Sequence, residues 1–160
     1  MGEIPMNSSL IFSVRSTVAQ VEEAKQLAPK FGADGFITCV TTAAATGDLL
    51  MVGYMNREAL TLTIQTSQAH YWSRSRNALW HKGAISGLTQ DVVEMRIDDD
   101  QDAAWLRVNV AGSGASCHVG YRSCFYRAVK PITGHLRFVE SAKTFDPAFV
   151  YGDIPNPTYL

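Results

Sequence analysis

The feature that most constrains this 160-residue chain is the stretch from Asp98 to Arg127, where two groups of metal-binding side chains flank one predicted strand. The stretch opens with four aspartates among residues 98–102. It closes with the pair Cys117-His118 and with Cys124. Between the groups, residues 104–110 alternate apolar and polar, as in a strand with one buried face. We interpret the stretch as two metal sites of different hardness that share one strand end.

The aspartate run allows two interpretations. If it is extended, Asp98, Asp100 and Asp102 project from one face and Asp99 from the other. Three carboxylates on one face repel one another unless a cation lies among them, and magnesium favours oxygen ligands. A run of aspartates is also typical of a solvated turn. On composition alone both interpretations stay open.

The cysteines are equally open to two interpretations. Cysteine and histidine are ligands that suit zinc. The spacing of Cys117 and Cys124 matches no zinc-finger pattern, however, and a buried cysteine pair can simply pack as small apolar residues. The third cysteine, Cys39, lies inside a predicted strand, and we interpret it as a core residue.

Composition and charge exclude several classes of protein. The length and the apolar share of 46% indicate one globular domain with a sizeable core. A net charge of −1 provides no basic field to attract nucleic acid. No apolar run reaches the roughly 20 residues that a membrane span needs. An odd number of cysteines and the lack of a secretory signal indicate a reducing, cytoplasmic location.

Periodicity and capping signals predict a single-domain α+β fold with a mainly antiparallel sheet and about two helices. One helix is expected from Thr17 to Ala28, ended by Pro29, and another from Arg57 to about Gln68. The predicted strands are 35–42, 49–54, 69–76, 79–83, 92–97, 104–110, 122–129 and 138–140.

The predicted hairpin of residues 69–83 is dense in aromatic and basic side chains. Arg74, Arg76 and Lys82 could stack on its aromatic rings. They could equally bind a phosphate, with Ser86 in a following turn that offers backbone N–H groups. The residues alone do not decide between these roles.

Several of these motifs, in this order, resemble the phosphoribosyl-AMP cyclohydrolase family of histidine biosynthesis. They are Tyr71–Arg76, Leu79–Gly83, Ser86-Gly87, the Asp98, Asp100 and Asp102 triplet, Cys117-His118, Gly120 and Arg122–Arg127. The resemblance runs from about Phe31 to Val129. It implies a metal-dependent hydrolase that opens the adenine ring of 1-(5-phosphoribosyl)-AMP at the N1–C6 bond. It also implies an intertwined homodimer that uses zinc and magnesium.

The resemblance assigns roles to individual residues. It places magnesium on Asp98, Asp100 and Asp102, and zinc on Cys117 and Cys124. His118 is then positioned to shuttle a proton, although a structural role beside the metal is the alternative. The expected contacts to substrate are Arg74, Arg76, Lys82, Ser86 and Arg122. The implied organisation is an N-terminal extension and helix (1–30), a catalytic domain (31–130) and a C-terminal extension (131–160) packed on the body or on the partner subunit.

Departures from the family pattern concentrate in the presumed site. Asp99 stands where the family has its third zinc cysteine, so we expect it to meet Cys117 and Cys124 of the partner subunit. This carboxylate makes the zinc site harder, which favours manganese, iron or magnesium or weakens zinc. The other departures are Ala84, Ile85, Leu88, Val119 and Tyr121. They leave open a divergent hydrolase acting on another purine-like nucleotide, or a non-catalytic metal-binding homologue.

Overall fold

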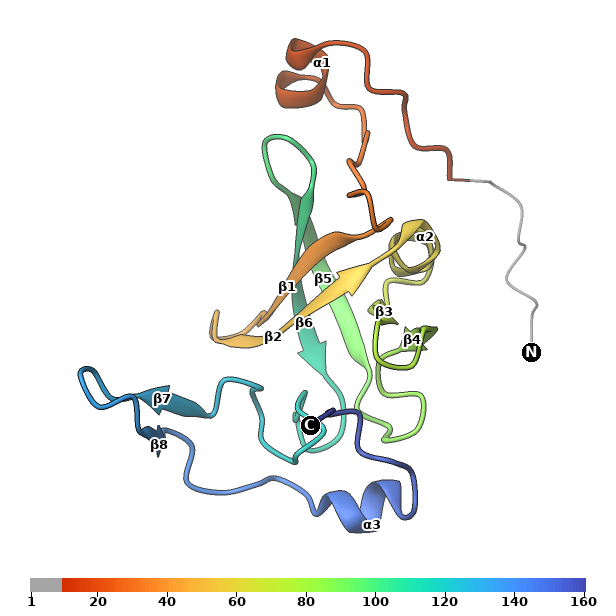
Figure 1. Ribbon diagram of the computed structural model, residues 1–160. Coiled ribbons are helices and arrows are strands. Elements are labelled where there is room, and N and C mark those ends of the chain that lie inside the picture. The colour runs from red at the N-terminus through yellow and green to blue at the C-terminus, as the bar shows by residue number, and fades with distance from the viewer. Residues whose placement is uncertain (1–9) are drawn as a thin grey trace, which may run out of the picture.

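The computed structural model describes residues 10–160 as a small single-domain α+β fold rich in antiparallel pairs (Figure 1). The helices in this range are α1 (Val18–Glu23), α2 (Arg57–Thr66) and α3 (Pro147–Tyr151). The strands are β1 (Ile37–Ala43), β2 (Leu49–Met55), β3 (His70–Ser73), β4 (Ala78–His81), β5 (Gln90–Ile97), β6 (Ala103–Val110), β7 (Arg127–Val129) and β8 (Leu136–Phe138). The fold class is the predicted one, with one short helix more than expected.

The central sheet has the strand order β2-β1-β6-β5. The pairs β1–β2 and β5–β6 are antiparallel neighbours in sequence, whereas β1 and β6 run parallel. Alternate residues of β1, such as Ile37 and Cys39, are buried in one core with Leu60 of α2 and Tyr71 of β3. Cys39 is therefore a core residue, as predicted.

The β3–β4 hairpin forms a separate two-stranded sheet beside β2. Its turn contains Asn77 with a φ of 49°, a conformation that asparagine tolerates better than most residues. Gly53 in β2 permits the close packing, because a Cβ there would lie 2.8 Å from a ring carbon of Tyr71. The basic and aromatic hairpin is thereby fixed against the core.

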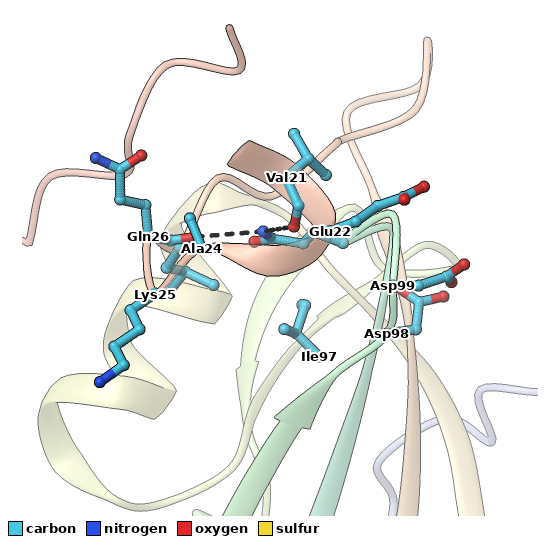
Figure 2. Close-up of a pocket in the computed structure, with 10 residues that line it drawn as sticks. Val21, Glu22, Ala24, Lys25, Gln26, Ile97, Asp98 and Asp99 are labelled. Atoms are coloured by element: carbon cyan, nitrogen blue, oxygen red, sulfur yellow. Dashed lines mark hydrogen bonds between the residues drawn. The ribbon is translucent and has the colours of Figure 1, made fainter. Parts of the chain in front are cut away.

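The N-terminal helix is shorter than predicted. The Thr17 hydroxyl accepts a hydrogen bond from Gln20 N at 3.0 Å, as the capping signal predicted, but α1 ends at Glu23 instead of near Ala28. The reason is a tertiary contact with Gln101, whose side chain bonds Gln26 O at 3.2 Å and Ala28 N at 2.8 Å. These backbone groups are therefore held outside the helix, and Gln26 lines a pocket together with Asp98 and Asp99 (Figure 2).

The chain after β6 has less regular structure than predicted. The expected strand 122–129 is wrong over most of its length, since only Arg127–Val129 pairs, with Leu136–Phe138. Residues 122–126 instead form a loop held by Cys124 N, which donates to Leu50 O of β2 at 2.7 Å. The β7–β8 hairpin and α3 lie beyond the end of the sheet that is remote from the β5–β6 turn (Figure 1). None of the helices in residues 10–160 is long and apolar enough to cross a membrane.

Candidate active site

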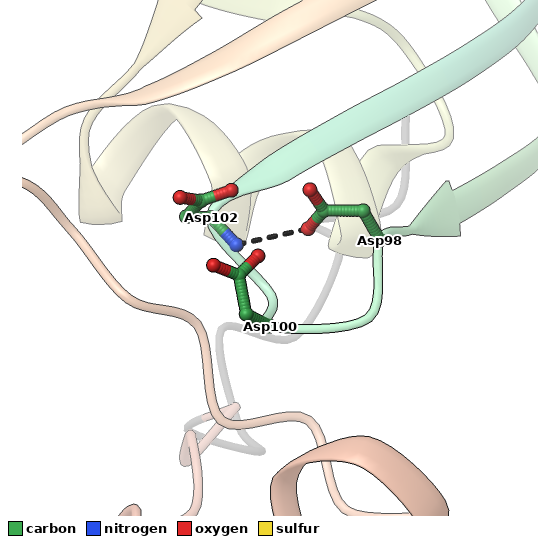
Figure 3. Close-up of side chains that lie close together, drawn as sticks. All are labelled: Asp98, Asp100 and Asp102. Carbon is green, nitrogen blue, oxygen red and sulfur yellow. Dashed lines mark hydrogen bonds between the residues drawn. The ribbon is translucent and has the colours of Figure 1, made fainter.

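The aspartate triplet lies in the turn between β5 and β6 and converges within a single chain (Figure 3). Ligand oxygens of Asp98, Asp100 and Asp102 lie within 4.8 Å of one another. The run is a turn rather than an extended segment: Asp98 Oδ1 accepts from Asp102 N at 3.0 Å, and Gln101 has a φ of 60°. The three side chains meet as predicted. They do so because the backbone reverses direction, and not because the run is extended.

The electrostatics of this turn suit a hard cation. The pKa of Asp102 is raised above its ordinary value, first by a hydrogen bond with Asp100 and also by burial and by the charge of Asp98. Closely spaced carboxylates that disfavour one another's ionisation are stabilised when a divalent cation lies among them. The three aspartates therefore fit magnesium.

Asp99 is not part of the triplet, although it lines the same pocket as Asp98. It is exposed and lines a pocket of about 330 Å³ between α1 and the turn, together with Glu22 and Lys25 (Figure 2). Within one chain, Asp99 therefore lies beside the N-terminal helix. The prediction that it meets cysteines of a partner subunit is tested by nothing in a single chain.

Short backbone hydrogen bonds shape the loop that carries the cysteines. Ser116 N donates to Arg122 O at 3.0 Å, and Cys117 N donates to Tyr121 O at 3.2 Å. Together with the bond from Cys124 N to β2, they bring the thiols of Cys117 and Cys124 within hydrogen-bonding reach. The sequence separation of seven residues is thus closed by the loop itself.

The two thiols share a proton unequally. The pKa of Cys117 is lowered to about 6, first by the hydrogen bond from Cys124 and also by the charge of Lys82. The pKa of Cys124 is raised in turn, because it retains the shared proton and is partly desolvated. A thiolate beside a thiol is a suitable start for zinc, which binds deprotonated cysteine. The pair fits zinc but supplies only two of its usual ligands.

The two groups of ligands do not share one strand end, contrary to the sequence interpretation. The aspartate turn immediately precedes β6, and the cysteine loop follows its other end (Figure 1). A strand of this length spans about 26 Å. In residues 10–160, the aspartate triplet is the one group of three or more potential ligands that lie close together. One chain therefore does not complete a three-ligand site around Cys117.

His118 presents an unpaired nitrogen at the cysteine loop. Its Nε2 atom is buried without a hydrogen-bond partner. Burial lowers the pKa of His118, the charge of Lys82 lowers it further, and a hydrogen bond with Asn156 raises it. The imidazole is therefore neutral at neutral pH and has a nitrogen available to accept a proton.

The basic residues of the predicted substrate site make varied contacts. Arg74 lies 3.8 Å over the ring of Tyr54 in β2, and Arg76 lies 5.4 Å over the ring of Trp80 in the hairpin. Arg122 forms ion pairs of 3.2 Å and 3.5 Å with Asp48 and Glu140. Lys82 is buried, with its amine directed to Ser116 O at 2.6 Å.

The departures from the family pattern occupy two kinds of environment. Ala84 and Ile85 are exposed in the turn after β4, whereas Leu88 is buried, and Ser86 Oγ accepts from Leu88 N at 3.2 Å. Tyr121 stacks on Tyr126 with ring centroids 4.0 Å apart. An aromatic residue at position 121 thus packs against its own loop.

The C-terminal segment reaches the cysteine loop. Thr144 N donates to Gly120 O at 2.7 Å, and Asn156 bonds His118. Gly120 has a φ of 107°, and a Cβ there would lie 2.5 Å from Phe145 O. Further along, the Tyr159 hydroxyl donates to Ser75 O at 2.7 Å. The segment therefore joins the His118 loop to the basic hairpin.

Comparison with known proteins identifies the family. The phosphoribosyl-AMP cyclohydrolase family model matches residues 51–126. A relative named phosphoribosyl-AMP cyclohydrolase from Bradyrhizobium diazoefficiens is 56% identical over 134 residues, which cover 82% of this chain and 94% of the relative. The chain belongs to the phosphoribosyl-AMP cyclohydrolase family.

Further members of the family support this assignment over most of the chain. A phosphoribosyl-AMP cyclohydrolase from Rhodopseudomonas palustris is 55% identical, covering 82% of this chain and 90% of the relative. One from Bradyrhizobium sp. is 58% identical, covering 77% and 95%. The matched family region contains the basic hairpin, the aspartate turn and the cysteine loop. The family resemblance drawn from the sequence motifs is thereby confirmed.

Proposed function

We propose that this protein is a phosphoribosyl-AMP cyclohydrolase, which adds water to the adenine ring of 1-(5-phosphoribosyl)-AMP and breaks its N1–C6 bond in histidine biosynthesis. The observation that supports this most is the cysteine loop, where Cys117 and Cys124 lie within hydrogen-bonding reach and the buried Nε2 of the adjacent His118 has no hydrogen-bond partner. The names and high identities of the relatives support the same reaction. A cytoplasmic location stays a prediction.

The metal ligands follow from the two groups of side chains. Asp98, Asp100 and Asp102 would hold magnesium, and Cys117 and Cys124 would hold zinc, with Asp99 of a partner subunit as the third ligand of that site. Zinc held by these residues would lower the pKa of a bound water to about 7 and so supply a nucleophile at neutral pH.

His118 moves protons in the proposed reaction. Because its pKa is lowered, the neutral imidazole can accept a proton from the water that attacks C6 of the adenine. The same nitrogen can return this proton to N1 as the C–N bond breaks. Asn156, bonded to His118, would hold the ring in the orientation that aims Nε2 at the substrate.

The substrate phosphates would bind near the basic hairpin. Arg74, Arg76 and Arg122 offer guanidinium groups that suit bidentate contact with phosphate. Ser86 adds a hydroxyl in the turn after β4. Arg122 would exchange its ion pairs with Asp48 and Glu140 for the phosphate.

A homodimer would bring the two sites together. The aspartate turn and the cysteine loop lie at opposite ends of β6, so a shared active centre requires the turn of one subunit to approach the loop of another. Sedimentation at micromolar concentration should show a dimer; a monomer with full activity would contradict shared sites.

The decisive experiment is a turnover assay with 1-(5-phosphoribosyl)-AMP in buffers of defined zinc, manganese and magnesium content. Ring opening changes the ultraviolet absorbance of the purine, and mass spectrometry should show a gain of one water. AMP serves as the control nucleotide, since it lacks the N1 substituent. Turnover of another purine nucleotide, with none of phosphoribosyl-AMP, would favour the divergent hydrolase; metal binding without any turnover would favour the non-catalytic homologue.

A further inference from the structure

Ser116, the residue before Cys117, is held by two buried side chains at once. Lys82 Nζ donates to Ser116 O at 2.6 Å, and Gln90 Nε2 donates to Ser116 Oγ at 3.0 Å. All three residues are buried: Lys82 is 4% exposed, Gln90 0% and Ser116 2%. The start of the cysteine loop is therefore anchored inside the protein by one charged and one neutral donor.

The neutral anchor extends deep into the core. Gln90 Oε1 accepts from the Tyr71 hydroxyl at 2.6 Å, and this hydroxyl bonds Thr41 Oγ1 at 2.7 Å. Tyr71 and Thr41 are completely buried. Strands β5, β3 and β1 thus fix the position of Ser116 through one chain of hydrogen bonds, and such buried networks rigidify the groups they connect.

The charged anchor lacks a carboxylate partner in the part of the chain that the structure describes. The ammonium of Lys82 offers three donors, yet its hydrogen bond goes to a neutral carbonyl, and it packs 4.7 Å over the ring of Trp80. A buried amine is costly unless its donors are satisfied, so the contacts with Ser116 and Trp80 fix Lys82 in place.

We propose that Lys82 is a positioning residue of the cysteine loop, which fixes Ser116 and with it the neighbouring Cys117, and that it does not contact the substrate phosphate. This inference rests on the proposed function, because it assigns Lys82 a different role at the same site. A side chain that binds the substrate phosphate must reach the protein surface. The amine of Lys82 is instead buried and already hydrogen-bonded.

The test compares Lys82→Met with Ser116→Ala. Methionine keeps an apolar stem against Trp80 but removes the charge and the donor; Ser116→Ala removes only the acceptor of Gln90 and keeps the carbonyl. Zinc retention is measured by competition with a chromophoric chelator, without substrate. Lys82→Met should bind zinc about 10- to 100-fold more weakly, as for groups that support metal ligands. Ser116→Ala should lose no more than about fivefold, the worth of one neutral hydrogen bond.

Kinetics separate positioning from substrate binding. Lys82→Met should lower kcat while KM stays within about twofold, whereas loss of a phosphate contact should raise KM. Wild-type zinc retention combined with a raised KM would overturn the proposal. If circular dichroism shows that Lys82→Met does not fold, Lys82→Arg replaces it. This variant should retain zinc as well as the unmodified protein does, and weaker retention would overturn the proposal. An unmodified protein that binds zinc but does not hydrolyse phosphoribosyl-AMP would refute the proposed function and leave the zinc comparison intact.

Discussion

The aspartate turn and the cysteine loop solve the same problem, gathering metal ligands, in opposite ways. In the turn, five successive residues bring three carboxylates together near the surface through one backbone reversal, and Gln101 alone ties this turn to the N-terminal segment. In the loop, two thiols meet because buried residues of β2 and β5, and Lys82 just after β4, hold the backbone around them. A hard site can thus be built locally, whereas the soft site depends on the folded protein around it.

The difference has a physical reason. Carboxylates are well solvated, so an exposed turn can carry three of them at modest cost until a cation arrives. A thiolate exposed to water is readily protonated or oxidised. A partly buried site beside a cation protects it from both reactions. The cysteine loop therefore depends on buried residues around its ligands, whereas the ligands of the aspartate turn stay close to solvent.

The largest effect is expected at the cysteine loop. Cys117→Ser should abolish zinc binding and lower activity at least about 100-fold, because a metal-held nucleophile is lost. Cys39→Ala is the matched control: Cys39 is fully buried, and burial raises its pKa to about 12, so it is no ligand. This variant should keep its zinc and its activity. Equal losses in both variants would mean that cysteine packing, and not ligation, supports activity.

Mixing two inactive variants tests whether the turn and the loop act across subunits. Asp100→Asn should lose magnesium dependence and most activity, because one charged hard ligand is removed. When it is refolded together with Cys117→Ser, a mixed dimer contains one site with both partners intact. About a quarter of the wild-type activity should return if sites are shared in a two-fold dimer. If mass spectrometry shows mixed dimers but no activity returns, the aspartate turn and the cysteine loop do not form one site across subunits.

Asp99→Cys sharpens the comparison in the other direction, by making the zinc site softer. Cys117 and Cys124 provide two soft ligands, and a third thiolate should hold zinc more selectively than a carboxylate does. The unmodified protein should therefore retain less than stoichiometric zinc after dialysis against a weak chelator, and the variant should retain more. Full and equal occupancy in both proteins would show that Asp99 is an adequate ligand.

The smallest effect is expected from magnesium on thermal stability. Because the pKa of Asp102 is raised in the folded state, its contribution to stability is greatest below the ordinary aspartate pKa and is lost as pH rises through the raised value. Magnesium should offset this loss at neutral pH, raising Tm by about 5 °C at saturating concentration. Little gain is expected at pH 4, or in Asp100→Asn at any pH. Differential scanning calorimetry in EDTA and in magnesium measures both.

Local signals predicted the elements that depend on local causes. The cap at Thr17, the helix after Asn56 and the hairpin around Asn77 follow from side chains within a few residues of each backbone group they satisfy. The convergence of Asp98, Asp100 and Asp102 was also predictable, although the extended geometry assumed for it was wrong. Contacts between residues close in the chain determine these features, so they can be predicted from one sequence.

Other features depend on residues far apart in the chain, and sequence patterns did not reveal them. Gln101 ends α1 through bonds to residues more than seventy positions earlier, and nothing near Glu23 signals that end. Ser123 and Cys124 bond to β2, which replaces the predicted strand by a loop. Asn156 reaches His118 from the C-terminal segment. Long-range hydrogen bonds override local preference in each case.

The parallel pairing of β1 with β6 has a consequence for how the chain folds. Cys39 pairs with Ala104, so everything from the β1–β2 hairpin to β5 must be gathered before this pairing can close. Contacts of such long sequence separation carry a large loop-closure entropy and slow folding. The hairpins β1–β2 and β5–β6 can form early from near neighbours, whereas their union comes late. Because β6 leads directly into the cysteine loop, a refolding chain should acquire tight zinc binding only in its slowest phase.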